Sequence, residues 1–464
     1  WHLFSSLSAN HKKVSDIFCT FAMTKLTKTM ETSALYQLYR QQQVVTTDSR
    51  HCPEGSIFIA LKGASFDGNR FAEAALQQGC AYAVVDNPAY CPQGDARYIL
   101  VPDCLTAYKE LAREHRRQFQ IPVIGITGTN GKTTTKELVS AVLAERYRVM
   151  CTEGNYNNDV GVPKTLLRLT EEDEIAVVEM GASHPGDIRQ LVEYVEPTCG
   201  LITNVGRAHL QGFGSFEGVK RTKGELYDWL KAHDCLTFID ADNEHLVAMA
   251  NERGLGRMVS YSASADSAAT VEGEAVSCDP LLRFAWWAEG TGRHEVQTRL
   301  IGAYNVTNLL AAVAIGRYFG VSDACIDHAL AHYEPTNNRS QLTVTPHNSL
   351  IVDAYNANPT SMRAAIDNFC FMQVPNKMAI LGGMRELGEA SAEEHQRVAD
   401  YLQARGLDNV WLVGSEFAQT QCPYRKFADV EEVKHALAEA MPTQHYILIK
   451  GSNGIHLSQL ASIL

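Results

Sequence analysis

IPVIGITGTNGKTTTKELVSAVL, residues 121–143, is the stretch of this sequence that decides its fold. The apolar run Ile121–Thr127 is typical of a strand buried on both faces of a sheet, and a helix is predicted from Lys132 to Arg146. Between them lies the glycine-rich turn GITGTNGKT, Gly125–Thr133. A strand, a glycine-rich turn and a helix in this order are typical of a phosphate-binding loop.

The residues of this turn suit the phosphates of a nucleotide. Glycines let successive backbone N–H groups face a phosphate, and the helix that follows adds its positive end. Lys132 can reach the outer phosphates, and the Thr133 hydroxyl can hold Mg²⁺. The strict pattern has glycine where this chain has Ile126, which leaves open a tight strand–helix turn with an ordinary lysine. The predicted nucleotide-binding residues here are Gly128, Thr129, Asn130, Gly131, Lys132, Thr133 and Thr134.

Strands and helices alternate in both directions from the loop and predict an α/β protein of three domains. We expect an extension at 1–29, a small α/β domain at 30–119, a central parallel-sheet domain with the phosphate loop at 120–335, and a doubly wound, Rossmann-like domain at 336–464. Residues 260–300 predict a β-rich insertion, and the polar stretch Pro335–Arg339 predicts a hinge. Strands are expected at 56–61, 81–85, 121–127, 148–152, 175–180, 199–203, 235–239, 350–354, 377–382, 409–414 and 446–450.

The composition is that of a globular protein and excludes several function classes. The 464 residues are 45% hydrophobic and carry a net charge of −12, which disfavours a nucleic-acid partner. No apolar run approaches the roughly 18 residues that a membrane span needs. The 12 cysteines form no C-x-x-C pair, so we expect free thiols in a cytoplasmic monomer rather than a zinc or redox site.

Five further segments narrow the assignment: NYNNDVGVP (155–163), EMGASHPGDI (179–188), AHLQGFGS (208–215), DAYNANPTSM (353–362) and GGMRELG (382–388). Together with the loop, they resemble the Mur ligase family, in order, from Glu31 to the C-terminus. The resemblance implies an ADP-forming, ATP-dependent ligase that adds D-alanyl-D-alanine to UDP-N-acetylmuramoyl-tripeptide through an acyl phosphate. These two compounds are the implied partners, in peptidoglycan precursor synthesis.

Such chemistry builds up negative charge, so cations must be held among the phosphates and the substrate carboxylate. Glu179 ends a predicted strand, where a carboxylate faces the ligand crevice. The resemblance implies that Glu179 holds Mg²⁺ with Thr133, and that Lys223, carbamylated by CO₂, holds a second Mg²⁺ with His209. Alternatives without a role at a metal stay open. Glu179 would then be a solvated strand-end glutamate and His209 a histidine that is no ligand, and Lys220, Arg221 and Lys223 would form a solvated helical face.

The resemblance also assigns the rest of the nucleotide site. It puts Asn305 and Asn308 at the adenine and ribose, beside Tyr304, where many members have histidine. Arg339 and Asp353 would swing onto the nucleotide when the third domain closes, with Arg339 offsetting charge on the transferred phosphoryl group. Surface salt bridges are the alternative for both.

Two sets of residues are implied for the substrates. Ser49, Arg50 and Lys62 carry donors suited to uracil and pyrophosphate. The amides of Asn157, Asn158, Asn356 and Asn358 suit a zwitterionic peptide, which needs both donors and acceptors.

Two other functions stay open. A folylpolyglutamate-type ligase shares the loop and the lysine but has no dedicated uridine domain, whereas residues 30–119 precede the loop here. A P-loop switch protein would hydrolyse ATP without any dipeptide, and would leave the 353–359 segment and the third domain without a purpose.

Overall fold

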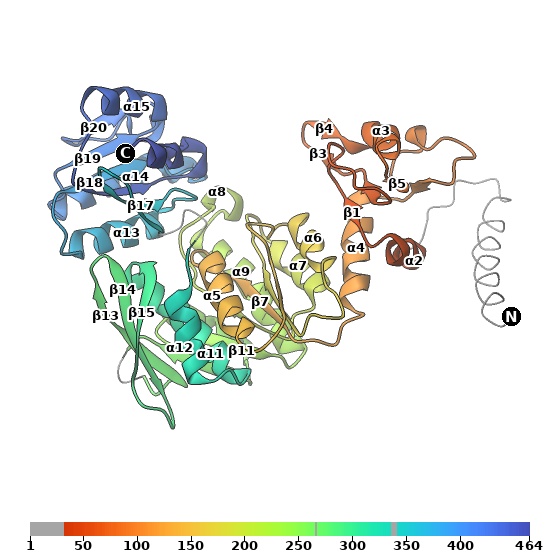
Figure 1. Cartoon of the computed structure of the whole chain (residues 1–464), viewed down its shortest axis with the longest axis horizontal. Coiled ribbons are helices and arrows are strands. Elements are labelled where there is room, and N and C mark those ends of the chain that lie inside the picture. Colours follow the sequence, from red (N-terminus) through yellow and green to blue (C-terminus); the bar gives the residue numbers. More distant parts are fainter. Residues whose placement is uncertain (1–31, 265–266, 336–340) are drawn as a thin grey trace. The chain divides into compact units, whose positions relative to one another are not determined.

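The computed structural model describes residues 32–264, 267–335 and 341–464 (Figure 1). It divides into two compact units, one that ends at Glu114 and one from His115 to Leu464, and each is described by itself. The predicted extension at 1–29 and residues 336–339 of the predicted hinge, Arg339 among them, lie outside the described residues. No helix in the described ranges is long and apolar enough to cross a membrane.

The first unit is built on a parallel sheet of four strands in the order β1-β2-β5-β6. The strands are β1 (Val45–Thr46), β2 (Ile57–Ile59), β5 (Tyr82–Val85) and β6 (Tyr98–Leu100), and a two-stranded ribbon is formed by β3 (Lys62–Gly63) and β4 (Phe66–Asp67). Its helices are α2 (Thr32–Gln42), α3 (Ala72–Gln77) and α4 (Cys104–Arg116), which continues into the second unit. All three residues of β2 are buried, as the apolar run predicts for a strand covered on both faces.

A nine-stranded sheet carries the phosphate loop, in the order β15-β14-β13-β12-β11-β10-β7-β9-β8. Its parallel part consists of β7 (Val123–Thr127), β8 (Val149–Cys151), β9 (Ile175–Glu179), β10 (Cys199–Ile202), β11 (Leu236–Asp240) and β12 (Met258–Ser262). The predicted β-rich insertion is the antiparallel ribbon of β13 (Val271–Cys278), β14 (Leu281–Ala288) and β15 (His294–Ile301).

Helices cover both faces of this sheet. Buried residues of α5 (Lys132–Ala144) and α11 (Val306–Tyr318) form one core with Ile124 and Ile126, while α7 (Asp187–Val195) and α9 (Phe216–Ala232) contact β7 from the other side. The remaining helices are α6 (Gly161–Leu166), α8 (Leu210–Phe213), α10 (Glu244–Arg253) and α12 (Asp323–His332).

The C-terminal sheet has six strands in the order β16-β17-β21-β18-β19-β20. They are β16 (Gln341–Val344), β17 (Ser349–Asp353), β18 (Lys377–Gly382), β19 (Val410–Val413), β20 (Arg425–Phe427) and β21 (Tyr446–Lys450). Successive residues of β17 alternate between two cores: Ile351 packs with α13 (Pro359–Phe371) and α14 (Ser391–Ala404), and Leu350 with α15 (Val430–Glu439). The predicted doubly wound arrangement is therefore confirmed, and only β16 runs antiparallel to its neighbour.

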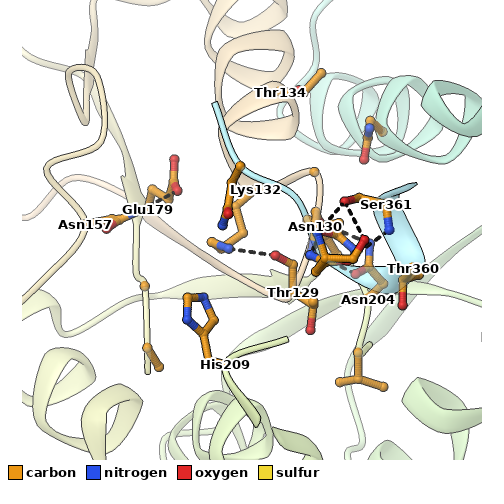
Figure 2. A pocket seen from close by; sticks show the side chains of 18 of the residues that line it. Thr129, Asn130, Lys132, Thr134, Asn157, Glu179, Asn204, His209, Thr360 and Ser361 are labelled. Carbon is orange, nitrogen blue, oxygen red and sulfur yellow. Dashed lines mark hydrogen bonds between the residues drawn. The ribbon is translucent and has the colours of Figure 1, made fainter. Parts of the chain in front are cut away.

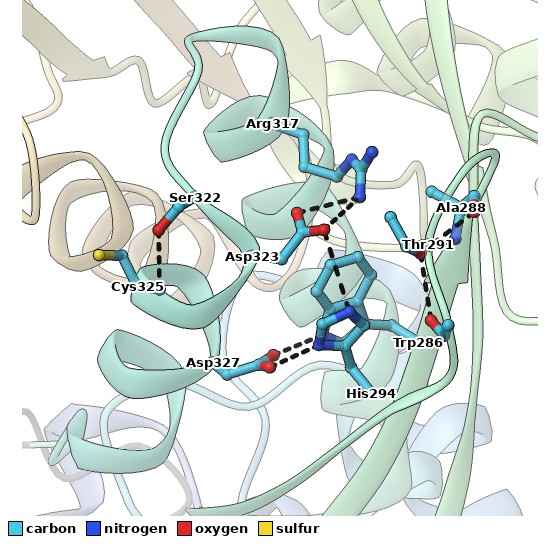
Figure 3. Close-up of polar contacts among 10 residues, drawn as sticks. Trp286, Ala288, Thr291, His294, Arg317, Ser322, Asp323, Cys325 and Asp327 are labelled. Atoms are coloured by element: carbon cyan, nitrogen blue, oxygen red, sulfur yellow. Dashed lines mark hydrogen bonds and ion pairs between the residues drawn. The ribbon is translucent and has the colours of Figure 1, made fainter.

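A partly exposed polar cluster beside the buried Trp286 fastens the antiparallel ribbon to the helices (Figure 3). Asp327 on α12 accepts a hydrogen bond from the indole N–H of Trp286 at 2.7 Å and pairs with Nδ1 of His294 at 2.6 Å. The two rings are stacked with centroids 4.2 Å apart, and Trp286 is fully buried. Arg317 bonds both oxygens of Asp323 at 3.0 Å beside them. One carboxylate thus holds both strands of the β14–β15 hairpin on α12.

Replacing Asp327 with alanine is expected to destabilise the second unit by about 1–3 kcal/mol, because the buried indole N–H of Trp286 loses its acceptor. The matched variant Asp327→Asn keeps an acceptor oxygen and should lose much less. Thermal unfolding followed by tryptophan fluorescence measures both. Equal midpoints for Asp327→Ala and the parent protein would show that the cluster does not fasten the ribbon.

Candidate active site

A cavity of about 970 Å³ opens at the carboxyl ends of the central parallel strands, where the segment 353–361 of the C-terminal sheet also contributes side chains (Figure 2). The predicted site residues that line it are Thr129, Asn130, Gly131, Lys132, Thr134, Asn157, Asn158, Glu179, His209, Asn305, Asn308, Asp353, Asn356 and Asn358. Thr133 and Lys223 are buried and do not line it. Because parallel strands run in the same direction, their carboxyl ends and the loops that follow them come together at one edge of a sheet.

The phosphate loop has the backbone that its glycines predict. Gly128 and Gly131 have φ of +143° and +77°, and a Cβ on Gly128 would lie 2.0 Å from the Thr203 hydroxyl oxygen. Lys132 closes the loop by donating from Nζ to the carbonyl oxygens of Gly128 and Thr129, both at 3.0 Å. Ile126, the departure from the strict pattern, lies inside β7 and is fully buried, so it takes no part in the turn.

Thr133 and Glu179 form the polar base of the loop. The Thr133 hydroxyl donates to one oxygen of Glu179 at 2.9 Å, and the Asn157 amide donates to the other at 2.7 Å. Glu179 has no exposed surface, so the alternative of a solvated strand-end carboxylate is wrong. A hydroxyl and a carboxylate beside a phosphate loop are the oxygen donors that Mg²⁺ prefers, and this pair fits that ion.

Lys223 lies inside the protein, on α9. It is 2% exposed, whereas Arg221 is exposed, so the alternative of a solvated face is wrong for Lys223. Burial, with the charge of Lys132 as a second cause, holds the pKa of Lys223 well below its ordinary value. Its ammonium nitrogen lies 5.6 Å from the centre of the Phe213 ring. Burial of this kind favours the neutral amine of a lysine over its ammonium form.

His209 precedes α8 with a left-handed backbone, φ +50°. Its Nδ1 lies 2.5 Å from a carboxylate oxygen of Glu386, a residue that the sequence analysis missed. Burial lowers the pKa of His209, and the neighbouring Glu386 opposes that shift. Among the residues the structure describes, no group of three or more His, Cys, Asp or Glu is placed to hold a metal, so the ligand set Thr133, Glu179, His209 and Lys223 stays a prediction.

The asparagines predicted for adenine and ribose tie the helices of the site together. Asn308 donates to the side-chain oxygen of Asn305 at 2.8 Å and accepts from the Thr135 hydroxyl at 3.0 Å, so that α11 is joined to α5. Tyr304 is 36% exposed and lines the cavity, as does Asp240, whose pKa burial raises to about 6. Asp240 was missed, although its place at the end of a buried strand was a usable signal.

The segment 353–356, which begins at the end of β17, is held in place by a buried lysine. Lys450, at the end of β21 and 1% exposed, donates to Asp353 at 2.6 Å and to the carbonyl oxygen of Asn356 at 3.3 Å. The partner of Asp353 is thus a buried lysine, and the alternative of a surface salt bridge is wrong for this residue. Lys450 was also missed by sequence reasoning, because its partner lies 97 residues away.

The residues predicted for the uridine end lie in the first unit. Arg50 is exposed and forms an ion pair with Asp48 at 2.9 Å, in the turn that also contains Ser49. Lys62 pairs with the buried Asp86 at 2.7 Å, and Asp86 also accepts from the amide of Asn69 at 2.8 Å. The carboxylate therefore fixes Lys62, whose side chain is half exposed.

Comparison with known proteins gives the family. Three family models match: the Mur ligase family catalytic domain over residues 42–116, the Mur ligase middle domain over 126–316, and the Mur ligase, glutamate ligase domain over 338–453. The UDP-N-acetylmuramoyl-tripeptide--D-alanyl-D-alanine ligase of Bacillus subtilis is 34% identical over 90% of this chain and 92% of its own.

Solved structures agree with this match. MurF from Acinetobacter baumannii aligns with a TM-score of 0.82 at 29% identity, over 92% of this chain and 97% of that one. A MurF ligase from Thermotoga maritima in complex with ADP aligns with a TM-score of 0.81 at 26% identity, over 91% and 97%. From these matches, and from the phosphate loop within the expected three-domain architecture, the chain belongs to the Mur ligase family and is of the MurF type.

Proposed function

We propose that this protein joins D-alanyl-D-alanine to UDP-N-acetylmuramoyl-tripeptide, with ATP converted to ADP and phosphate. The observation that carries the proposal is the cavity in which the phosphate loop, Glu179 with Thr133 bonded behind it, and the 353–358 segment meet. The curated relatives that carry this activity in their name match over 90% of the chain, which supports the same substrates here.

The reaction runs in two steps. A carboxylate oxygen of the tripeptide attacks the γ-phosphorus of ATP and ADP leaves, which forms an acyl phosphate. The amine of the dipeptide then attacks the acyl carbon, an amide bond forms, and phosphate and a proton depart. Lys132 and the N–H groups of the loop bind the phosphates, and Arg339 offsets charge on the transferred group. Asn305, Asn308 and Asp353 border the nucleotide.

Thr133 and Glu179 would hold one Mg²⁺, which neutralises phosphate charge when bound. We assign a second Mg²⁺ to His209 and to Lys223 as a carbamate. The ammonium of Lys223 first loses one proton. The neutral amine then attacks CO₂, a C–N bond forms as one C–O π bond opens, and a second proton is released, so a cation becomes an anion. The buried position and lowered pKa of Lys223 support this assignment.

The substrates would be held by the two predicted sets. Ser49, Arg50 and Lys62 would bind the uridine diphosphate end, with Lys62 pre-positioned by Asp86. Asn157, Asn158 and Asn356 line the cavity and would contact the peptide. Asn358 was assigned to the same role, but its amide bonds Asn130 and the first turn of α13 in this structure.

Phosphate release from ATP tests the proposed function. With UDP-N-acetylmuramoyl-tripeptide present, we expect release to need D-alanyl-D-alanine and to match the amount of ligated product. Release at the same rate without the dipeptide would instead support a P-loop switch protein. Release driven by a folate and glutamate would support a folylpolyglutamate-type ligase.

A further inference from the structure

The side-chain amides of two asparagines that line the cavity are hydrogen-bonded to each other, and the two residues lie in loops that follow strands of different sheets. Asn358, which precedes α13, donates from Nδ2 to Oδ1 of Asn130 at 2.7 Å. Asn130, in the phosphate loop, donates back from Nδ2 to Oδ1 of Asn358 at 3.5 Å. The pair therefore links the nine-stranded sheet to the six-stranded one at the nucleotide cavity.

The main chain of Asn130 is anchored independently of this pair. Its N–H donates to the side-chain oxygen of Asn204 at 3.0 Å. Its carbonyl oxygen accepts from the Asn204 amide at 3.0 Å and from the Thr203 hydroxyl at 2.6 Å. Both partners follow β10, the strand beside the loop, so the phosphate loop presents the Asn130 side chain in a fixed direction.

Asn358 is anchored as firmly on its own side. Its Oδ1 accepts from the N–H of Ser361 at 2.9 Å, while its N–H donates to the Ser361 hydroxyl at 3.1 Å, which is a capping box. Only 7% of Asn358 is exposed. The first turn of α13 holds the Asn358 side chain. The hydrogen bonds between Asn358 and Asn130 therefore fix the start of this helix relative to the phosphate loop.

The C-terminal half of α13 also contacts the part of the protein built on the nine-stranded sheet. The side-chain oxygen of Asn368 accepts from the N–H of Ala303 at 3.3 Å and from the Cys278 thiol at 3.4 Å. Ala303 directly precedes Tyr304 and Asn305, which also line the cavity. Helix α13 is thus attached to two segments that border the cavity: the phosphate loop, through Asn358, and the turn before α11, through Asn368.

We propose that Asn130 and Asn358 form an interdomain latch that keeps the segment 353–358 at the cavity and links it to the state of the phosphate loop. Both are positioning residues. This inference rests on the proposed function only in taking ATP as the ligand of the loop. Lys450, which belongs to the same sheet as Asp353, holds Asp353 within the C-terminal part. The Asn130–Asn358 latch is what attaches the segment 353–358 to the phosphate loop.

A double-mutant cycle tests the latch. Asn358→Ser keeps a residue that caps the helix but is too short to reach Asn130, and Asn130→Ala removes the other half. We expect each single variant to weaken binding of a non-hydrolysable ATP analogue about tenfold, and the double variant to bind no more weakly than either single one. Titration calorimetry measures all four proteins, and unchanged thermal midpoints would show that each variant is folded.

Two outcomes would overturn the latch: single effects that multiply in the double variant, or an Asn358→Ser variant that binds like the parent. Asn87→Ser, at another capped turn, is the matched control and should leave analogue binding unchanged. Analogue binding without dipeptide-dependent ligation in the parent protein would count against the proposed function and leave the latch standing.

Discussion

Replacing Lys132 with alanine is expected to lower the ligation rate by about 100- to 1,000-fold, because a cation is lost where negative charge develops on the phosphates. The side chain now donates to two carbonyl oxygens of its own loop, at 3.0 Å each. Phosphates that enter the loop would offer it stronger, charged acceptors. The loss should therefore fall on kcat as well as on ATP affinity.

Binding of the uridine substrate is the control for this variant. Ser49, Arg50 and Lys62 lie in the first unit, so Lys132→Ala should bind the uridine substrate as the parent does. Coupled phosphate-release kinetics and calorimetry give the two quantities. Normal turnover in Lys132→Ala would contradict the assignment of the phosphate loop.

Much of the fold is predictable because buried parallel strands have long apolar runs. Ile121–Thr127 and Lys377–Gly382 are such runs, and both contain interior strands, β7 and β18, that have a neighbouring strand on each side. The edge strands β16 and β20 were not predicted. Gln341–Val344 is partly exposed along its length, so its sequence carries little of the hydrophobic pattern that marks a strand. The exact domain boundaries, at 119/120 and 335/336, stay predictions.

The residues of the site also differ in how far the local sequence predicts them. Residues at the end of a strand or directly after it, such as Glu179 and the loop glycines, are predictable because local sequence places them at the carboxyl edge of the sheet. Glu386 and Lys450 are not, because their contacts with His209 and Asp353 join distant segments. Lys223 shows the limit most clearly: its basic neighbours suggest a solvated face, and only the packing of α9 shows that it is buried.

Lys223→Ala is the second variant with a large expected effect. If the lysine is a carbamate that holds Mg²⁺ with His209, its loss should reduce ligation by about 100-fold or more, since a ligand and its negative charge disappear together. Lys231→Ala, an exposed position on the same helix, is the matched control and should change activity little. Steady-state ligation rates at fixed Mg²⁺ compare the two.

Chemical rescue separates the carbamate from an ammonium that binds phosphate. Because Lys223 is 2% exposed, its removal leaves a cavity, and acetate can place a carboxylate there. We expect acetate to restore part of the activity of Lys223→Ala, and removal of bicarbonate to slow the parent protein but not the variant. A large loss that acetate leaves unchanged would favour the ammonium. Activity within a few-fold of the parent would contradict any role at the metal, while the loop, Thr133 and Glu179 would still support ligation.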